Sequence, residues 1–400
     1  MIPINYSIDE DRKESLIHKY PPPTFETESA TFILEEAEKG ATVSTYVLVN
    51  DFELRRTRTD KKFLKLSFSN PSGNIPAKMW DNDGEIEQYI PLLESTGVFH
   101  IRGQVDEFNG FKSVTVYDLA PSKEAINPAL LLATTNQDIH QLSEELFAYL
   151  LELDEPYQAV SFRLLDLFWD SFSTSPAAKG MHHHYLGGLL KHTVGLMRFC
   201  RYITKIEDNP FQAVMRLIHQ VEKQYKVEIW EALKSDETNH RFVWKDTIDH
   251  LYSMLHGMSE YKYDSIDYSA LMTSILFHDI GKLAEYNYAG RKDDFFTYLY
   301  PSAPFEETRQ VQSGISMDSL GVMVGHIPYG VLILNKIIND HEIHLSMEKI
   351  HLISHCILCH HGLPEWGSAV RKPQTIEGYI IHIVDYLDSR YENTEADNQR

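Results

Sequence analysis

The sequence predicts an α+β chain in which a small β-barrel is followed by an all-α domain that carries a helical insertion. Short segments rich in β-branched and aromatic residues, partly alternating with polar ones, fill residues 41–122. After about residue 123, apolar residues recur at helical spacing. The length of 400 residues also favours two domains, since domains usually contain roughly 100–200 residues.

Turn signals separate the predicted strands of the first domain. The five strand-like segments are STYVLVNDFELR, KFLKLSFS, IPAKMW, GVFHIRGQVDEF and FKSVTVYDL. Asn109-Gly110 lies between the last two segments and predicts a hairpin, and the run from Pro71 to Asn74 predicts another turn. Five short strands in about 80 residues suit a barrel of the OB type.

The remaining boundaries follow changes in composition. Pro21 to Pro23 interrupts any helix in the N-terminal part. The predicted divisions are an N-terminal extension at 1–40, the barrel at 41–122, a helical connector at 123–172, the helical domain at 173–392 with a more polar insertion at about 205–268, and a solvated tail at 393–400.

Composition excludes several functional classes. The formal net charge is -21, which argues against a general binder of duplex DNA but leaves room for a local basic groove. No apolar run approaches the roughly 18–20 residues that a membrane span needs, and the N-terminus lacks a signal-peptide pattern. With only three cysteines, a disulfide framework is not expected. We expect a cytoplasmic protein without a membrane partner, and a homo-oligomer is compatible with the sequence.

The segment SALMTSILFHDIGKLAEY is the strongest chemical signal. An apolar helix delivers His278 and Asp279 side by side, and an imidazole next to a carboxylate suits a divalent metal ion. Asp279 has two oxygens and can bridge two ions, and the Lys282 ammonium could reach a phosphate oxygen. The alternative is an ordinary His-Asp pair at a helix end, capped by the lysine. We therefore take Asp279 and Lys282 as catalytic candidates.

Further candidate ligands lie on other predicted helices. The segments are MHHHYLGGLLKHT, GHIPYGVLILNK, ISHCILCHHG and YIIHIVDYLDSRY, which present His182, His183, His184, His192, His326, His355, His360, His361, His382, Asp385 and Asp388. Several helices that each present His or Asp are hard to explain as packing alone. Two alternatives stay open: His182, His183 and His184 either contact substrate phosphate or form a solvated turn, and Asp388 either supports a ligand or is exposed.

These motifs resemble the HD superfamily of metal-dependent phosphohydrolases. By position, His192 matches the first histidine, His278-Asp279 the signature pair, and Asp385 the final aspartate. The resemblance implies two divalent transition-metal ions. It implies a first ion held by His192, His278, Asp279 and Asp385, and a second held by Asp279, His326, His360 and His361. Manganese or iron suits this mixture of nitrogen and oxygen ligands.

A narrower resemblance is to the bacterial YhaM-type 3′→5′ exoribonucleases, which have an OB domain followed by an HD domain. HH-x-YLGGLLKHT, LFHDIGK, HCILCHHG and HIVDYLD carry it in the helical part, and FLKLSFSNPSGNIPAKMWD and GQVDEFNGFKSVTV carry it in the barrel. It covers about residues 41–204 and 268–392. The extension and the insertion have no evident counterpart, and the stretch between HDIGK and His326 is longer than expected.

A basic patch on the barrel is the candidate contact for substrate. Within residues 52–78, seven basic side chains against two acidic ones leave a local charge of +5. Together with the nearby aromatic residues they are typical of single-stranded nucleic acid binding. The alternative is that the aromatic residues fill the barrel and the charges are solvated. The candidates are Arg55, Arg56, Arg58, Lys61 and Lys62, with Phe63, Phe68, Trp80, Phe108 and Phe111 between or near them.

The sequence thus predicts an enzyme that hydrolyses single-stranded RNA from the 3′ end to nucleoside 5′-monophosphates, with single-stranded DNA as an alternative partner. One rival is an HD phosphodiesterase acting on cyclic dinucleotides or small nucleotides. A rival of another class is a nucleic-acid-binding protein with an inactive HD domain, which the complete set of ligands argues against.

Overall fold

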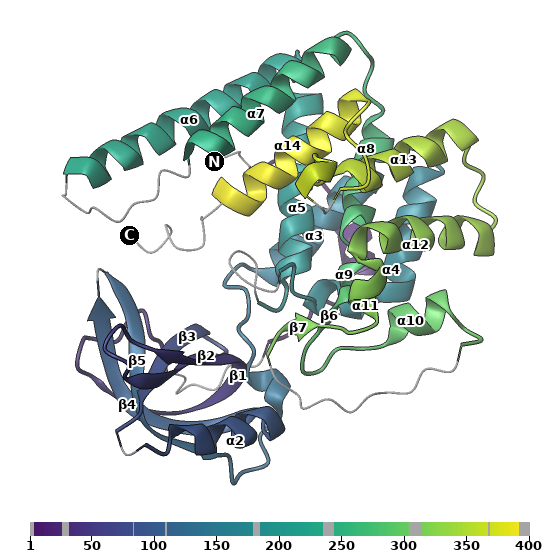
Figure 1. Cartoon of the computed structure of the whole chain (residues 1–400). Coiled ribbons are helices and arrows are strands. Elements are labelled where there is room, and N and C mark those ends of the chain that lie inside the picture. Colours follow the sequence, from purple (N-terminus) through teal and green to yellow (C-terminus); the bar gives the residue numbers. More distant parts are fainter. Residues whose placement is uncertain are drawn as a thin grey trace.

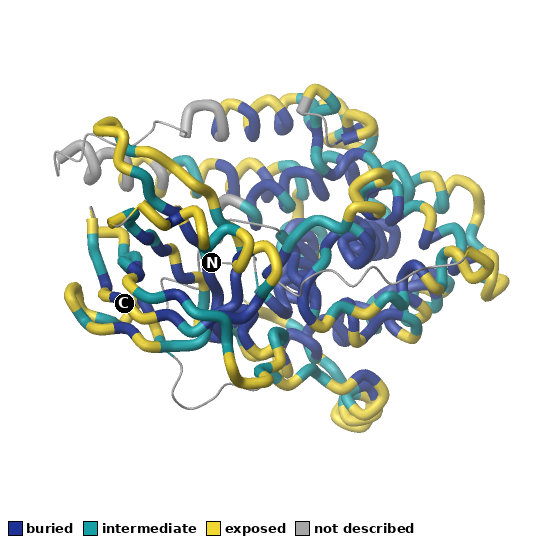
Figure 2. Tube along the Cα trace, turned by 60° about the horizontal axis from the view of Figure 1, so that its bottom comes forward, coloured by how far each residue is buried: buried dark blue, intermediate teal, exposed yellow. Residues whose placement is uncertain are grey.

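The computed structural model describes residues 4–25, 32–82, 84–108, 110–178, 185–234, 244–303, 314–366 and 369–391. A β-barrel forms one end of the molecule, and a larger helical body forms the other (Figure 1). Buried residues gather along the inside of the barrel and in the middle of the helical body (Figure 2).

The barrel is closed by five strands: β1 (Thr42–Arg56), β2 (Lys62–Asn70), β3 (Gly73–Trp80), β4 (Val98–Phe108) and β5 (Phe111–Pro121). Their order is β1-β2-β3-β5-β4, and the pairing is antiparallel except between β3 and β5. The short helices η1 (Ile86–Gln88) and α2 (Tyr89–Ser95) connect β3 to β4. The predicted small barrel of the OB type is therefore confirmed.

Aromatic residues of the barrel lie both in its core and at the exposed end of a hairpin. Leu64, Leu66 and Phe68 of β2 are buried in the barrel core. Phe108 and Phe111, at the ends of the β4–β5 hairpin, have exposed fractions of 76% and 79%. The predicted hairpin is present, although Asn109 itself lies outside the described residues. Packing therefore accounts for Phe68 but not for the two phenylalanines at the hairpin.

Within the N-terminal extension, residues 4–25 pack against the helical body, and Leu34 packs in the barrel core. Helix α1 (Glu10–Lys19) begins after Asp9, whose side chain accepts from the Arg12 backbone N–H. Beyond its end, the Tyr20 hydroxyl donates to Asp166 at 2.6 Å, and the Trp169 indole N–H donates to the Pro21 carbonyl at 2.7 Å. The described residues of the extension are thus a packed part of the fold.

One apolar core unites the helical body. Its main helices are α3 (Ile139–Leu151), α4 (Tyr157–Thr174), α5 (Gly188–Arg201), α8 (Tyr268–His278), α12 (His326–Asp340), α13 (Met347–Cys359) and α14 (Ile376–Tyr391). Helix α8 is buried along nearly its whole length and packs against α4, α5, α12 and α13. Because α8 carries no charged side chain before His278, it is stable in the centre of this core. Among the described residues, none of the helices combines the length and apolar character needed to cross a membrane.

The segment predicted as an insertion contains two long helices, α6 (Pro210–Lys234) and α7 (Trp244–Met258). They pack against each other, and α7 also packs against α14 (Figure 1). Apolar side chains of both helices, among them Val214, Ile218 and Leu251, are buried in the common core. The insertion is therefore anchored to the helix that carries Asp385.

Barrel and helical body meet through a small apolar cluster. Leu48 and Val98 of the barrel pack with Leu132, Tyr286 and Ile315.

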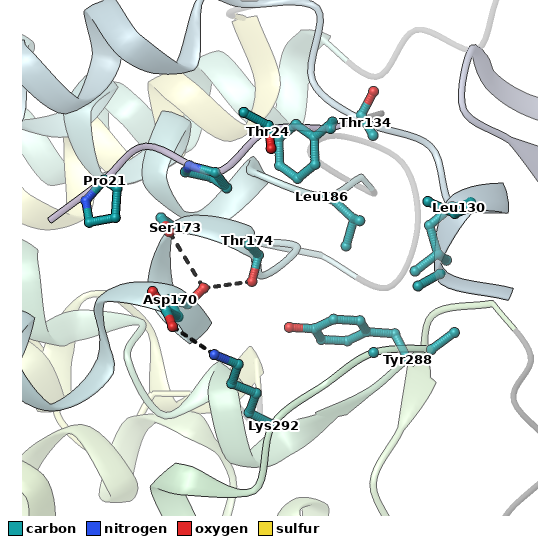
Figure 3. A pocket seen from close by; sticks show the side chains of 16 residues that line it. Pro21, Thr24, Leu130, Thr134, Asp170, Ser173, Thr174, Leu186, Tyr288 and Lys292 are labelled. Atoms are coloured by element: carbon teal, nitrogen blue, oxygen red, sulfur yellow. Dashed lines mark hydrogen bonds and ion pairs between the residues drawn. The ribbon is translucent and has the colours of Figure 1, made fainter. Parts of the chain in front are cut away.

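A cavity of about 400 Å³ lies where the extension, the segment after the barrel, and the helical body come together (Figure 3). At one end Lys292 forms an ion pair with Asp170 at 2.7 Å, and Tyr288 and Leu186 form part of the lining. None of the predicted metal ligands lines this cavity.

Candidate metal centre

The turn after α8 presents the signature pair. The α8 helix starts at the capping residue Asp267, and His278 and Asp279 at its other end are both buried. Gly281 is required two residues later, because a Cβ there would lie 2.1 Å from the backbone oxygen of His326. Glycine thus lets the start of α12 (His326–Asp340) approach the turn that carries Asp279.

The first group of candidate ligands surrounds one oxygen of Asp279. Its Oδ2 lies 3.4 Å from His192 Nε2 and 3.3 Å from His278 Nε2, and the two nitrogens are 3.3 Å apart. Asp385 Oδ1 lies 3.2 Å from His192 Nε2. Atoms bound to one ion at about 2.1 Å lie roughly 3.0–3.4 Å from each other. The spacing of these four side chains therefore suits a single ion.

The second group surrounds the other oxygen. Asp279 Oδ1 lies 3.6 Å from His326 Nε2 and 3.7 Å from His360 Nε2. The His361 ring is 4.3 Å from the His360 ring and 5.1 Å from the His326 ring, between centroids. One ring nitrogen each from His326, His360 and His361 lie within 4.8 Å of one another. The two oxygens of Asp279 thus face two separate groups of histidines.

Hydrogen bonds at the opposite ring nitrogen orient four of these histidines. Each Nδ1 lies 2.5–2.7 Å from an acceptor oxygen: His192 from Asp388, His278 from the Ile275 carbonyl, His326 from Glu285 and His360 from the Ile357 carbonyl. A neutral imidazole that donates through Nδ1 carries its lone pair on Nε2. When these four imidazoles are neutral, their lone pairs can therefore all be directed at the groups around Asp279.

Unsatisfied polar atoms show that this centre fits metal ions. Asp279 Oδ1, His326 Nε2 and His360 Nε2 are buried and have no hydrogen-bond partner among the described residues. Leaving such a group unpaired costs about 1–3 kcal/mol. A divalent ion of the transition series would coordinate all three atoms, since imidazole and carboxylate are its preferred ligands.

Burial and neighbouring charges favour the protonation states that bind metal in the second group. Burial, together with His361 and His278, lowers the pKa of His360 well below its usual value. Burial and His326 lower the pKa of His361 to about 4. Burial would raise the pKa of Asp279, but the charges of His278 and Lys282 hold it well below its usual value. The neutral imidazoles of His360 and His361 therefore face an ionised Asp279 carboxylate at neutral pH.

His192 differs from the other histidines. Burial by itself would lower its pKa, but hydrogen bonds to Asp279, Asp385 and Asp388 raise that pKa well above the usual value. Without an ion, His192 therefore keeps a proton at neutral pH. Since a metal ligand must give up that proton, ion uptake by the first group should release it and should strengthen as the pH rises.

Lys282 lies against the signature pair. Its ammonium forms a buried ion pair with Asp279 Oδ2. Burial would lower the pKa of Lys282, but the Asp279 carboxylate raises it above the usual value, so the side chain stays charged. The sequence predicts that this ammonium also reaches a phosphate oxygen, which stays a prediction.

Sequence reasoning missed one supporting residue and left another open. Glu285, on α9 (Lys282–Glu285), accepts a hydrogen bond from His326. In the sequence, the only signal that could have identified Glu285 is its position shortly after HDIGK. Asp388, for which two alternatives stood open, is buried and holds His192. Each histidine group thus contains one histidine that is held by a carboxylate.

We expect Asp388→Asn to weaken binding of the first ion and Glu285→Gln to weaken binding of the second. Carboxylates that orient a metal-bound histidine typically contribute 10- to 100-fold to metal affinity. Titration of metal-stripped protein with Mn²⁺ would resolve the two binding steps. Equal effects of both substitutions on both steps would contradict the assignment of one carboxylate to each group.

Other predicted residues lie outside these groups. His355 accepts from the Gln374 backbone N–H at 3.0 Å, and His382 lies against the backbone of His360. His182, His183 and His184 fall outside the described residues, so their predicted contact with substrate is not tested.

The basic residues of the barrel are placed at and beside the β1–β2 turn. Arg55, Arg56 and Lys62 form ion pairs with Glu53, Asp60 and Glu87, and Lys61 Nζ lies 5.2 Å from the centre of the Trp80 ring. Arg58 is exposed. Glu87 comes from outside residues 52–78, so the local charge is less positive than the sequence count. The patch lies on the barrel, while the metal groups lie among α5, α8, α12, α13 and α14 (Figure 1).

A family model described as "HD domain" matches residues 247–390. The helical body contains an HD domain. The matched residues include His278, Asp279 and Asp385 but begin after His192, which the structure nevertheless places 3.3 Å from His278. An HD domain implies dependence on divalent metal ions.

Curated relatives are similar over both domains. A protein named "3'-5' exoribonuclease YhaM" from Listeria monocytogenes is 21% identical over 359 residues, which cover 89% of this chain and 88% of the relative. Proteins of the same name are 22% identical over 357 residues in Bacillus licheniformis and 23% identical over 356 residues in Bacillus velezensis, each covering 88% of this chain and 86% of the relative. The resemblance drawn from the motifs is therefore confirmed. Together with the HD domain, these relatives support a hydrolase that acts as an exonuclease or a phosphodiesterase.

A solved structure of a replication protein A heterotrimer bound to single-stranded DNA also matches. It is 19% identical and covers 24% of this chain and 70% of that chain, with a TM-score of 0.17. A score this low supports no conclusion about fold or function.

Proposed function

We propose that this chain is a metal-dependent 3′→5′ exoribonuclease that hydrolyses single-stranded RNA to nucleoside 5′-monophosphates. The observation that carries the proposal is the position of Asp279, whose Oδ1 and Oδ2 face two different groups of histidines. This arrangement supports a centre for two ions, and two-ion centres are widely used to hydrolyse phosphodiesters. The similarity to exoribonucleases over 89% of the chain supports the choice of RNA.

The residues present suit two divalent ions. His192, His278, Asp279 and Asp385 would hold the first, and Asp279, His326, His360 and His361 the second. We favour manganese, with iron as the alternative, because imidazole-rich sites rarely suit magnesium. When bound, such ions activate a water molecule as the nucleophile and neutralise charge on the phosphate that is cleaved.

The chain's own residues supply the remaining parts of the reaction. Asp279 keeps both groups at a fixed separation, and the hydrogen bonds at Nδ1 keep the imidazoles of His192, His278, His326 and His360 turned toward Asp279. Lys282 contributes a fixed positive charge beside Asp279, where negative charge grows on the phosphoryl oxygens during attack. His326, His361 and Asp385 are more exposed than the other candidates, so substrate would enter on their side.

The barrel would recruit the polymer. Arg55, Arg56, Arg58, Lys61 and Lys62 offer positive charge to phosphates, and exposed Phe108 and Phe111 offer faces on which bases can stack. Such a surface distinguishes a polymer substrate from a cyclic dinucleotide, which would not need it. His182 and His183 are proposed to contact substrate from the helical domain.

A single assay separates the proposed function from its rivals. We expect 5′-labelled single-stranded RNA to shorten stepwise with Mn²⁺ present, with mononucleotides as the released product. Parallel reactions with single-stranded DNA and with a cyclic dinucleotide test the alternative substrates. Internal cuts, or turnover of the cyclic dinucleotide alone, would reject the exonuclease. Binding without any hydrolysis would favour the inactive rival.

Metal content tests the two-ion centre without measuring activity. Protein purified without a chelator should contain close to two transition ions per chain, and His326→Ala should reduce this to about one. Elemental analysis by mass spectrometry gives the stoichiometry. One ion in the unaltered protein would reduce the centre to a mononuclear one.

A further inference from the structure

A buried pair of histidines joins the predicted insertion to the candidate metal centre. His250, on α7 (Trp244–Met258), places its Nε2 2.7 Å from Nε2 of His382 on α14. Both side chains are buried, and the Tyr386 ring lies 4.9 Å from the His250 ring between centroids. Neither histidine belongs to the two ligand groups around Asp279.

The direction of the hydrogen bonds follows from the acceptor at the far end. His382 Nδ1 lies 2.6 Å from the backbone oxygen of His360. A carbonyl can only accept, so His382 donates through Nδ1. A neutral His382 then carries its lone pair on Nε2, and His250 must donate to it. The hydrogen bonds therefore run from His250 through His382 to the backbone of His360.

The turn after α13 leaves this arrangement little freedom. Gly362 has a φ of +81°, and a Cβ there would lie 2.4 Å from the His382 ring. The backbone after His360 thus packs directly on the imidazole that His250 holds. The His360 ring is fixed separately through its Nδ1, which donates to the Ile357 carbonyl at 2.7 Å. A shift of His382 would therefore displace the backbone of His360 and move its Nε2 away from Asp279.

We infer that His250 is a positioning residue for the second ion, acting through His382 on the backbone of His360. The inference rests on the proposed function, because it takes His360 as a metal ligand. It gives the predicted insertion a role, because helix α7 would then keep the backbone of His360 in place for the second group of ligands. The two histidines of the first group have other hydrogen-bond partners at Nδ1: Asp388 for His192 and the Ile275 carbonyl for His278.

The test compares two replacements of His250 in the full-length chain. His250→Phe keeps a ring but removes the donor, whereas His250→Gln keeps an N–H that can reach His382. Tyr252→Phe is the matched control, because Tyr252 lies on the same helix and donates to Glu222 at the exposed surface. Metal-stripped protein is titrated with Mn²⁺ by calorimetry, and the two binding steps are measured separately.

We expect His250→Phe to weaken the second step about tenfold, the low end of the range for groups that support metal ligands, and to leave the first step unchanged. His250→Gln should restore most of the loss, and Tyr252→Phe should change neither step. Unaltered second-step affinity in His250→Phe would overturn the inference. Equal weakening of both steps, without rescue by glutamine, would also overturn it, because it would indicate a general structural defect.

A further variant separates this inference from the proposed function. His360→Ala should abolish the second step whatever the role of His250. If His360→Ala keeps both ions, the two-ion assignment fails. If His360→Ala loses the second ion while His250→Phe binds it normally, the assignment stands and the role of His250 is rejected.

Discussion

Replacing Asp279 with asparagine is expected to reduce RNA hydrolysis by about a hundred- to a thousandfold, comparable with the removal of a main electrostatic group from an active site. The physical reason is that each carboxylate oxygen faces a different histidine group, so one substitution weakens both ion sites. The amide has one oxygen and no charge, and its NH₂ group would face one of the two groups. Single-turnover kinetics with saturating Mn²⁺ would measure the loss, and metal analysis should show that ion content falls as well.

Folding of the Asp279→Asn variant must be checked, because the substitution leaves the buried Lys282 ammonium without its carboxylate. A broken buried pair can cost about 3–5 kcal/mol of unfolding free energy. Thermal unfolding should therefore be compared with that of Asp279→Asn combined with Lys282→Met, which removes the unpaired charge. Asp340→Asn is a control for the substitution itself, since Asp340 lies at the far end of the α12 helix from His326. Near-normal turnover in folded Asp279→Asn would show that the metal assignment is wrong.

Reversing Arg55, Arg56 and Lys61 to glutamate is expected to weaken binding of long single-stranded RNA by about a hundredfold or more at low salt. The ion pairs of the two arginines, with Glu53 and Asp60, are exposed, and exposed pairs contribute only about 0–1 kcal/mol. These cations can therefore exchange their partners for phosphates. Each phosphate contact contributes about 0.7 to the slope of log affinity against log salt, so three lost contacts should reduce the slope by about 2.

A matched control separates local charge from net charge. Reversing Lys292, Lys336 and Lys372 changes the net charge by the same amount, and each of these lysines also pairs with an acidic residue on the surface, Asp170, Asp340 or Glu365. This variant should keep most of the RNA affinity and the salt slope. Turnover of a small phosphodiester should be unchanged in both variants. Equal loss of RNA binding in the two variants would mean that the barrel patch has no specific role.

Point substitutions are preferable to removal of the whole barrel. Leu48 and Val98 of the barrel pack into a shared cluster with Leu132 and Tyr286. A chain that starts after the barrel would expose this apolar surface to water and favour aggregation. A loss of activity in such a truncated chain would therefore not identify the barrel as the surface that recruits RNA.

The sequence alone determined the class of each domain and most of the residue types at the candidate metal centre. Strand-like segments separated by turn signals predicted the barrel, because alternation reflects one buried face at every second residue. The apolar run before His278 predicted a buried helix, and HDIGK identified the pair that it delivers. These signals are local, because each depends on residues within one helix, strand or turn. The amino-acid sequence is therefore enough to recognise them.

Only the tertiary structure decided which side chains support these residues. Asp388 lies 196 positions from His192, and Glu285 lies 41 positions from His326, yet both make hydrogen bonds of 2.5–2.6 Å to those histidines. The contact of His250 with His382 spans 132 positions. No periodicity encodes such pairs, because they arise when separate helices pack around one core. Tertiary structure also decided which aromatic residues of the barrel are exposed. Phe68 is buried and Phe108 is exposed because their positions in the closed barrel, and not the aromatic side chain itself, determine contact with water.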